Sequence, residues 1–168
     1  MFYSPFQKYF KILLGLFRLL KEYLLNFGSL KIHGFKYCIC PGTRFWIHNH
    51  GVFDLGTKTW ISENCIFESS GGSIKLGYNN FFNTNCRVIS IEKIIIGNNN
   101  LFGPNVVIID HDHEHSEDEK LICKQGYKRE TVVIGSDVWV GSNVTICKGV
   151  TICDHVVIGA NSVVTKSI

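Results

Sequence analysis

The sequence predicts an all-β fold, a triangular parallel solenoid in which each side of every turn is one short strand. Aliphatic residues recur at every sixth position near the C-terminus, a spacing that neither an α-helix nor an amphipathic strand produces. A second apolar series follows four residues behind, and glycines stand directly after several members of the first, where a corner needs space. The first series is Ile134, Val140, Ile146, Ile152, Ile158 and Val164, and the second is Val138, Val144, Val150 and Val156.

Composition is typical of a single domain without a nucleic-acid partner. The chain has 168 residues and a formal net charge of +3, which is too small to indicate a nucleic-acid-binding surface. Its seven cysteines are an odd number and show no metal-ligand spacing. We therefore expect free thiols that fill small apolar spaces in a reducing compartment, the cytoplasm.

The N-terminal segment, residues 1–28, predicts one amphipathic helix ahead of the solenoid. A narrow polar stripe recurs there at helical spacing, while nearly every other residue is apolar. We expect this helix either to pack against the solenoid or a neighbouring subunit, or to lie on a membrane through residues 1–27. The polar stripe consists of Gln7, Lys8, Lys11, Gly15, Arg18, Glu22 and Asn26. In the membrane interpretation, the residues near lipid headgroups are Lys8, Lys11, Arg18 and Lys21.

Charged residues interrupt this helix too often for it to cross a membrane. Lys11, Arg18, Lys21 and Glu22 break every apolar run into pieces shorter than a bilayer requires. No small-residue cleavage site follows, so a cleaved signal peptide is not expected. Any contact with the inner face of the membrane is therefore expected to be peripheral.

The remaining residues, 29–168, are expected to form the solenoid. The signal is weak between Lys31 and Asp54, where scattered aromatic and aliphatic residues indicate strands. From Leu55 onward the six-residue spacing is clear, with short resets between turns. It breaks once, over residues 109–133, in a stretch too polar for a core, which predicts an extruded loop. The positions in register before this break are Leu55, Ile61, Phe67, Leu76, Phe82, Val88, Ile96, Phe102 and Ile108.

The extruded loop holds three histidines at alternating positions among carboxylates. One interpretation is catalytic, with a single imidazole acting as general base. A second is a metal site, because alternating histidines can present several imidazoles together. A third is an acidic, solvated loop without chemistry. The histidines are His111, His113 and His115, and the carboxylates that could orient an imidazole are Asp110, Asp112 and Glu114.

From about Leu55 onward the sequence resembles the hexapeptide-repeat acyltransferases, and most closely the galactoside/maltose O-acetyltransferase branch. The repeat alone indicates only the fold. The run from Ile134 to Lys166, together with a histidine placed just after the preceding coil, is far more specific. The matching stretches are residues 82–85, 96–99, 104–106, 110–111, 134–142 and 158–166.

This resemblance implies a left-handed parallel β-helix that works as a homotrimer, with the active site in a cleft between two subunits. It implies acetyl-CoA as co-substrate and His111 as the general base, because the catalytic histidine of the family opens the extruded loop. Asn83 or Asn85 is expected to hold the acceptor, and Asn83 fits the repeat register better. The positions that match acetyl-CoA contacts are Trp139, Ser142, Ala160, Thr165 and Lys166, and no metal is expected.

The function implied is an acetyl-CoA-dependent O-acetyltransferase that acts on a sugar or polysaccharide hydroxyl. The basic apolar helix favours a cell-envelope glycan as acceptor. Three alternatives remain open. One is an N-acyltransferase acting on an amino sugar, and another is a scaffold protein that keeps the solenoid without transfer activity. The third is a metalloenzyme like the γ-carbonic anhydrases, whose ligands would be His111, His113 and His115 with His48 or His50.

Overall fold

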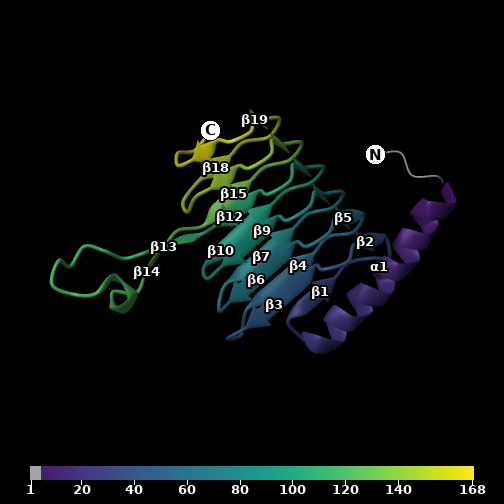
Figure 1. Ribbon diagram of the computed structural model, residues 1–168, viewed down its shortest axis with the longest axis horizontal. Coiled ribbons are helices and arrows are strands. Elements are labelled where there is room, and N and C mark those ends of the chain that lie inside the picture. The colour runs from purple at the N-terminus through teal and green to yellow at the C-terminus, as the bar shows by residue number, and fades with distance from the viewer. Residues whose placement is uncertain (1–4) are drawn as a thin grey trace.

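A computed structural model of the chain confirms the β-helix (Figure 1). The structure describes residues 5–168, with side chains from Tyr9 onward, so Gln7 and Lys8 of the polar stripe lie outside the described side chains. One helix, α1 (Pro5–Leu25), precedes three parallel sheets of six strands each. Successive strands pass from one sheet to the next, so three consecutive strands complete one turn of a triangular solenoid.

The three sheets are the walls of a prism, and in each wall the strands of successive turns pair in register. The first wall contains β1 (Leu30–Ile32), β4 (Val52–Leu55), β7 (Ser73–Leu76), β10 (Lys93–Ile96), β15 (Val132–Ile134) and β18 (Thr151–Ile152). The second contains β2 (Tyr37–Ile39), β5 (Thr59–Ile61), β8 (Phe81–Phe82), β11 (Leu101–Phe102), β16 (Trp139–Val140) and β19 (Val157–Ile158). The third contains β3 (Arg44–His48), β6 (Ile66–Ser70), β9 (Arg87–Ser90), β12 (Val107–Ile109), β17 (Thr145–Ile146) and β20 (Val163–Val164).

The six-residue series fills the axis of the prism, as the sequence predicts. Every member of the series from Leu55 to Val164 is buried. In the N-terminal half this core is aromatic. The rings of Phe53 and Phe67 stack with centroids 5.3 Å apart, and those of Phe82 and Phe102 stack at 4.5 Å. Each buried ring removes about 150–250 Å² of apolar surface from water, so every turn adds its own share of stability.

Glycines stand at the corners because adjacent turns approach closely there, and not because the backbone bends at these residues. A Cβ on Gly97 would lie 2.6 Å from the carbonyl oxygen of Gly135 in the next turn. The bend is instead taken by residues in the left-handed conformation, such as Asn99 (φ 60°) and Asn105 (φ 59°), which asparagine tolerates. Their amides also bond from turn to turn, as from Asn105 Nδ2 to Asn143 Oδ1 at 2.8 Å.

The solenoid begins one turn before the sequence spacing becomes regular. Strands β1 to β3 form a complete first turn, and they pair with β4 to β6 of the next. Ile32 and Ile39 are seven positions apart, and Phe45 and Leu55 are ten apart, instead of six. These uneven intervals hide the period, which explains the weak signal between Lys31 and Asp54.

The extruded loop is shorter than the predicted range of 109–133, and it carries strands of its own. Ile109 still pairs with Ile89, and Val132 already pairs with Ile94, so the excursion covers residues 110–131. Figure 1 shows it projecting from the side of the prism. Its elements are β13 (His111–His113), the 3-10 helix η1 (Ile122–Lys124) and β14 (Tyr127–Arg129).

Helix α1 lies across the N-terminal end of the solenoid (Figure 1). Residues of its polar stripe bond to the first turn. Arg18 donates a hydrogen bond to the carbonyl oxygen of Ile39 at 3.1 Å, and Asn26 donates one to that of Phe45 at 3.1 Å. The buried Glu22 carboxylate accepts a hydrogen bond from the Phe45 N–H at 3.3 Å. No strand precedes the first turn in the part of the chain that the structure describes, so the polar stripe pairs with backbone groups that would otherwise form an open sheet edge.

Leu19 is buried in the core and Leu16 and Tyr23 pack against it, but the rest of the apolar surface of α1 points away from the solenoid. Packing against the solenoid is confirmed, but Lys11 and Arg18, two of the residues expected at lipid headgroups, turn inward, and Lys11 pairs with Glu63 at 3.7 Å. Helix α1 is not apolar enough to cross a bilayer, and no other helix in the described part of the chain qualifies. The large apolar side chains of α1 left exposed are Tyr9, Phe10, Leu13, Phe17, Leu20, Leu24 and Leu25.

Candidate active site

His111 lies where the chain leaves the third wall for the extruded loop. We call the edge between the second and third walls the second edge, and the edge between the third and first walls the third edge. At the third edge β12 ends, Asp110 forms the corner, and His111 begins β13. Strand β13 pairs with the antiparallel β14, which sets Arg129 opposite His111 and Tyr127 opposite His113. The predicted base is therefore held between the wall and a returning hairpin.

Asp110 is fully buried and has four hydrogen-bond partners. Its Oδ2 accepts hydrogen bonds from the Ser90 hydroxyl at 2.7 Å and the Glu92 N–H at 3.0 Å, and its Oδ1 accepts one from the Ile91 N–H at 3.0 Å. The Nδ1 atom of His111 lies 3.0 Å from the same Oδ1. Because the backbone N–H groups are fixed donors, the carboxylate is an acceptor, and Nδ1 is the protonated ring nitrogen.

The other two candidate carboxylates have different partners. Asp112 Oδ2 lies 3.0 Å from Lys148 Nζ, and this contact raises the pKa of the Lys148 ammonium. Glu114 Oε1 accepts a hydrogen bond from the His115 N–H at 3.0 Å, and such bonds lower the pKa of the Glu114 carboxyl. Of the three carboxylates that the sequence leaves open, Asp110 is the one that orients His111.

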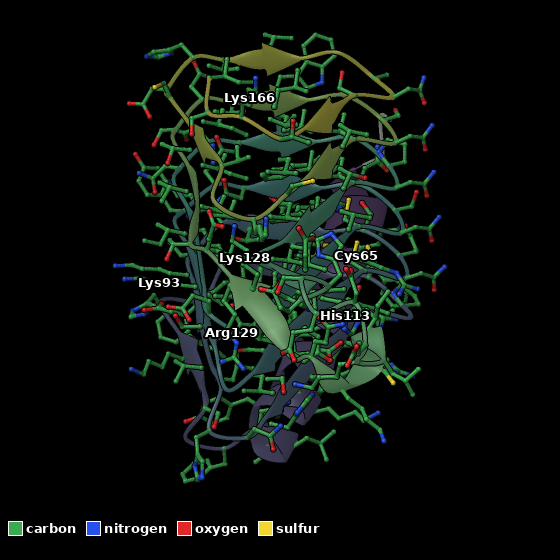
Figure 2. All side chains as sticks on the ribbon, turned by 90° about the vertical axis from the view of Figure 1, so that its left-hand side faces the viewer. Cys65, Lys93, His113, Lys128, Arg129 and Lys166 are labelled. Atoms are coloured by element: carbon green, nitrogen blue, oxygen red, sulfur yellow. The ribbon has the colours of Figure 1, made fainter. Side chains whose placement is uncertain are left out.

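His113 and His115 stay on the exposed hairpin. The ring of His113 packs against Tyr127 with centroids 4.7 Å apart, and His115 lies beside Glu114. Figure 2 looks onto this hairpin, with His113 and Arg129 in front of the prism. Among residues 9–168 no group of three His, Cys, Asp or Glu side chains is arranged to hold a metal ion. The alternating histidines thus do not converge on one point within a chain.

A groove of about 430 Å³ runs along the third edge beside His111. The His111 side chain is 13% exposed, and the ring of Tyr127 meets it edge-to-face at 5.4 Å. Arg129 lines the same groove, opposite Glu68 and Ser70 of the second turn. Sequence reasoning missed Tyr127 and Arg129, because their position depends on the hairpin's return. The only signal was an aromatic and basic cluster at the end of the loop.

The two predicted acceptor residues lie on the second edge, away from His111. Asn83 directly follows β8, and its side-chain oxygen accepts a hydrogen bond from the Thr84 N–H at 2.8 Å. Asn85 has a left-handed backbone (φ 61°) and donates to Asn105 Oδ1 at 3.1 Å, so it belongs to the turn-to-turn asparagine ladder. Strand β9 separates the second edge from the third by about 13 Å. Within one chain, neither Asn83 nor Asn85 reaches His111.

The predicted acetyl-CoA contacts divide between the same two edges. Trp139 is exposed on β16, and Ser142 and Ala160 occupy equivalent positions of successive turns on the second edge, because β16 pairs with β19. Thr165 and Lys166 follow β20 at the third edge; Figure 2 shows Lys166 near the C-terminal end of the prism. One chain alone does not bring the two groups of residues together.

Comparison with known proteins identifies the repeat. Residues 131–166 match the family described as bacterial transferase hexapeptide (six repeats). The chain is 38% identical over 115 residues to galactoside O-acetyltransferase of Escherichia coli K12, an alignment that covers 68% of this chain and 55% of that protein. The chain thus spans about half the length of the curated relatives that it matches.

Solved structures agree with this likeness. A maltose O-acetyltransferase from Clostridium difficile 630 is 37% identical with a TM-score of 0.63, over 69% of this chain and 61% of that one. A hexapeptide-repeat acetyltransferase from Vibrio cholerae, solved in complex with acetyl coenzyme A, is 27% identical with a TM-score of 0.61, over 89% and 68% of the two chains. The fold is the left-handed β-helix of these enzymes.

Proposed function

Starting from a chain that is a hexapeptide-repeat protein and a homologue of the galactoside and maltose O-acetyltransferases, we propose that it transfers the acetyl group of acetyl-CoA to a sugar or polysaccharide hydroxyl. The observation that carries this proposal is the pair formed by Asp110 and His111. A buried carboxylate fixes one nitrogen of the imidazole, and the ring borders a groove large enough for a substrate.

The proposed step uses His111 as general base. Because Nδ1–H donates its hydrogen bond to Asp110 and keeps its proton, Nε2 is free to take the proton of the acceptor hydroxyl. The acceptor oxygen attacks the thioester carbonyl carbon, and a backbone N–H of a neighbouring turn stabilises the oxyanion. The intermediate then collapses, the carbon–sulfur bond breaks, and the imidazolium returns its proton to the CoA sulfur. Acetyl-CoA is the co-substrate, and no metal takes part.

The complete site is proposed to lie between two subunits of a homotrimer. Asn83, Ser142 and Ala160 lie on the second edge, and His111, Thr165 and Lys166 lie on the third edge. If the second edge of one subunit lies beside the third edge of the next, the residues of both edges line one cleft. In this cleft Asn83 holds the acceptor, and Trp139 contacts acetyl-CoA with Ser142, Ala160, Thr165 and Lys166. Asn85 is a weaker candidate, because its amide serves the ladder.

The acceptor is proposed to be a cell-envelope glycan at the cytoplasmic face of the membrane. Two properties of the chain support this location: its basic, apolar N-terminal segment, residues 1–27, and the homology to sugar O-acetyltransferases. Transfer to an amino sugar would use the same base, so a panel of acceptors has to include both hydroxyl and amino sugars.

The proposal is tested by measuring acetyl-CoA turnover against a panel of sugars and oligosaccharides for the wild type and His111→Ala. Loss of the base should lower the transfer rate by about 10²-fold or more. CoA should still raise the melting temperature of the His111→Ala variant, because the residues proposed to contact CoA do not include His111. Treatment with a chelator should leave the wild-type rate unchanged.

His113→Ala is the matched control, since it removes an imidazole from the same hairpin without touching Asp110. It should keep most of the activity. Normal transfer by His111→Ala would show that the base is wrongly assigned. No acetyl transfer to any acceptor, combined with no thermal shift at millimolar CoA, would favour a scaffold protein instead.

A further inference from the structure

The outward face of α1 is an apolar surface that stays exposed among the residues whose side chains the structure describes. Leu13, Phe17, Leu20 and Leu24 follow one another along this face and are all exposed. Phe35, in the turn between β1 and β2, is 89% exposed and lines the groove beside α1 together with Leu20. A contiguous exposed patch of large apolar side chains marks a binding surface, because soluble proteins normally expose such side chains singly.

Cations predominate around this surface, although Asp54 lies opposite Lys31 and Glu68 lies beside His48. The first 53 residues contain seven Lys or Arg and a single acidic residue, Glu22. Glu22 is buried against the first turn, so it does not offset the cations outside. Lys21, Lys31 and Lys36 are exposed around α1 and the neighbouring turn. The face therefore complements an anionic, apolar partner.

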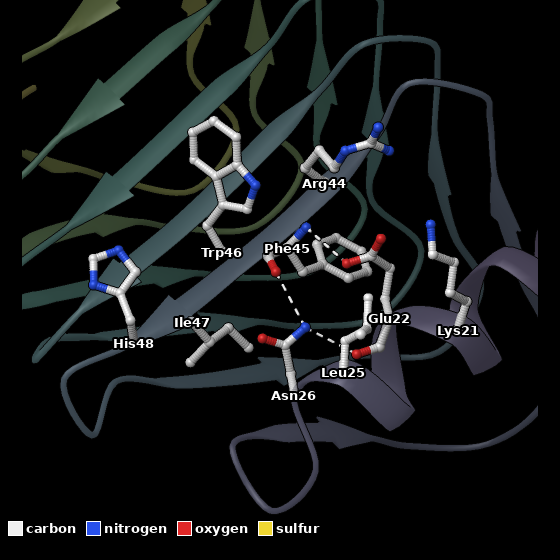
Figure 3. Close-up of a pocket in the computed structure, with 9 residues that line it drawn as sticks. All are labelled: Lys21, Glu22, Leu25, Asn26, Arg44, Phe45, Trp46, Ile47 and His48. Carbon is white, nitrogen blue, oxygen red and sulfur yellow. Dashed lines mark hydrogen bonds between the residues drawn. The ribbon is translucent and has the colours of Figure 1, made fainter.

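A groove of about 530 Å³ between the C-terminal half of α1 and β3 extends this pattern. Figure 3 shows Lys21, Arg44, Trp46 and His48 around it. The Trp46 side chain is about half exposed, and Arg44 is exposed beside it. A tryptophan together with cationic side chains next to an apolar helix face is the combination found at the membrane–water interface.

We propose that the N-terminal end of the solenoid docks on an anionic lipid bilayer, with α1 lying in the plane of the interface. Leu13, Phe17, Leu20, Leu24 and Phe35 enter the acyl boundary. At the headgroup level, the residues that meet lipid phosphates are Lys21, Lys31, Lys36 and Arg44, with Trp46 beside them. A second copy of the chain is a poorer occupant, because face-to-face contact would set these cations against each other with no exposed carboxylate of the first 53 residues between them.

This orientation changes which cations meet the headgroups. Lys11 and Arg18 bind the solenoid and are withdrawn from lipid, and the cations at the headgroups come instead from Lys21 and from the first turn. The polar stripe thus contacts the first turn, and the exposed apolar side chains of α1 contact the bilayer. Docking deepens the proposed location of the enzyme but does not depend on acetyl transfer, so it can be tested without any acceptor.

The test is co-sedimentation of the full chain with vesicles of phosphatidylcholine, with and without phosphatidylglycerol, each compared with a vesicle-free spin. The wild type should sediment with the anionic vesicles and much less with the neutral ones. Phe17→Glu and Leu20→Glu should each weaken binding by about 10-fold or more, because each loses the burial of one large apolar side chain. Lys21→Gln and Arg44→Gln should each weaken binding to anionic vesicles by about 5-fold and have little effect on neutral ones.

Leu121→Glu is the matched control. Leu121 is 65% exposed and Phe17 is 64% exposed, but Leu121 lies on the extruded loop, away from α1. The Leu121→Glu variant should bind anionic vesicles as strongly as the wild type does. The proposal is overturned if the wild type stays in the supernatant with anionic vesicles, or if Leu121→Glu loses as much binding as Phe17→Glu. A concentration-dependent doubling of the oligomer that Phe17→Glu abolishes, without vesicle binding, would identify a second copy as the occupant.

Discussion

Asp110 accepts hydrogen bonds from a hydroxyl, two backbone N–H groups and, in the assigned tautomer, the imidazole of His111. An amide at this position cannot accept all four, because its NH₂ group faces at least one donor. We expect Asp110→Asn to lower kcat by about 10²-fold or more, through loss of the productive tautomer, while KM for acetyl-CoA changes little. It should also reduce stability by about 1–3 kcal/mol, because a buried donor is left unpaired.

Ser90→Ala separates the two effects. It removes one hydrogen bond to Asp110 Oδ2 but leaves the contact between Oδ1 and His111 intact. Steady-state kinetics and thermal melting of both variants should show a shared loss of stability, and a loss of kcat in Asp110→Asn alone. Equal kcat in the two variants would mean that Asp110 supports the corner and does not position the base.

At this scale the sequence predicts the position of His111 but not its partner. The break in the six-residue spacing marks the corner, because polar residues cannot continue the core. Three carboxylates lie within three residues of His111, and sequence distance does not distinguish them. Only the burial of the corner against Ser90, Ile91 and Glu92 selects Asp110. Tyr127 and Arg129 depend on the return of the hairpin, which no local pattern encodes.

Helix α1 packs closely on the first turn at Gly15. A Cβ on Gly15 would lie 2.7 Å from the backbone nitrogen of Ile39 and 3.3 Å from its oxygen. Helix propensity alone favours Gly15→Ala by about 1 kcal/mol. The clash is with backbone and cannot be relieved by a rotamer change, so the helix has to lift from the first turn. We therefore expect Gly15→Ala to lower the free energy of unfolding by about 1–2 kcal/mol.

Urea unfolding followed by circular dichroism measures this change, and Leu24→Ala on the exposed face is the control. Leu24 contacts solvent, so its loss should change stability by less than about 0.5 kcal/mol. A stabilised Gly15→Ala protein would show that α1 does not pack on the first turn in solution. The sequence reveals the two faces of the helix. It does not reveal which face turns inward, because the backbone groups that attract the polar stripe belong to a turn whose own signal is hidden.

For the whole molecule, the separation of Asn83 and His111 on different edges leads to a complementation test. Chains carrying Asn83→Ala or His111→Ala should each be nearly inactive alone. Co-expressed in equal amounts, they should recover up to about a quarter of wild-type activity, because a random trimer joins an intact Asn83 to an intact His111 in about one cleft of four. Recovery is measured on the purified mixed assembly. Absence of any recovery, with mixing verified by mass spectrometry, would place the complete site within one subunit.

The number of turns below His111 has a geometric meaning if the N-terminal end rests on lipid. Three steps of about 4.8 Å separate β12 from β3, whose Arg44 is placed at the headgroups. The solenoid then holds the reacting histidine about 14 Å above the lipid phosphates. A sugar attached directly to a lipid phosphate would stay out of range, and only units farther along a growing chain would be acetylated. Insertion or deletion of a whole turn would move the modified position outward or inward.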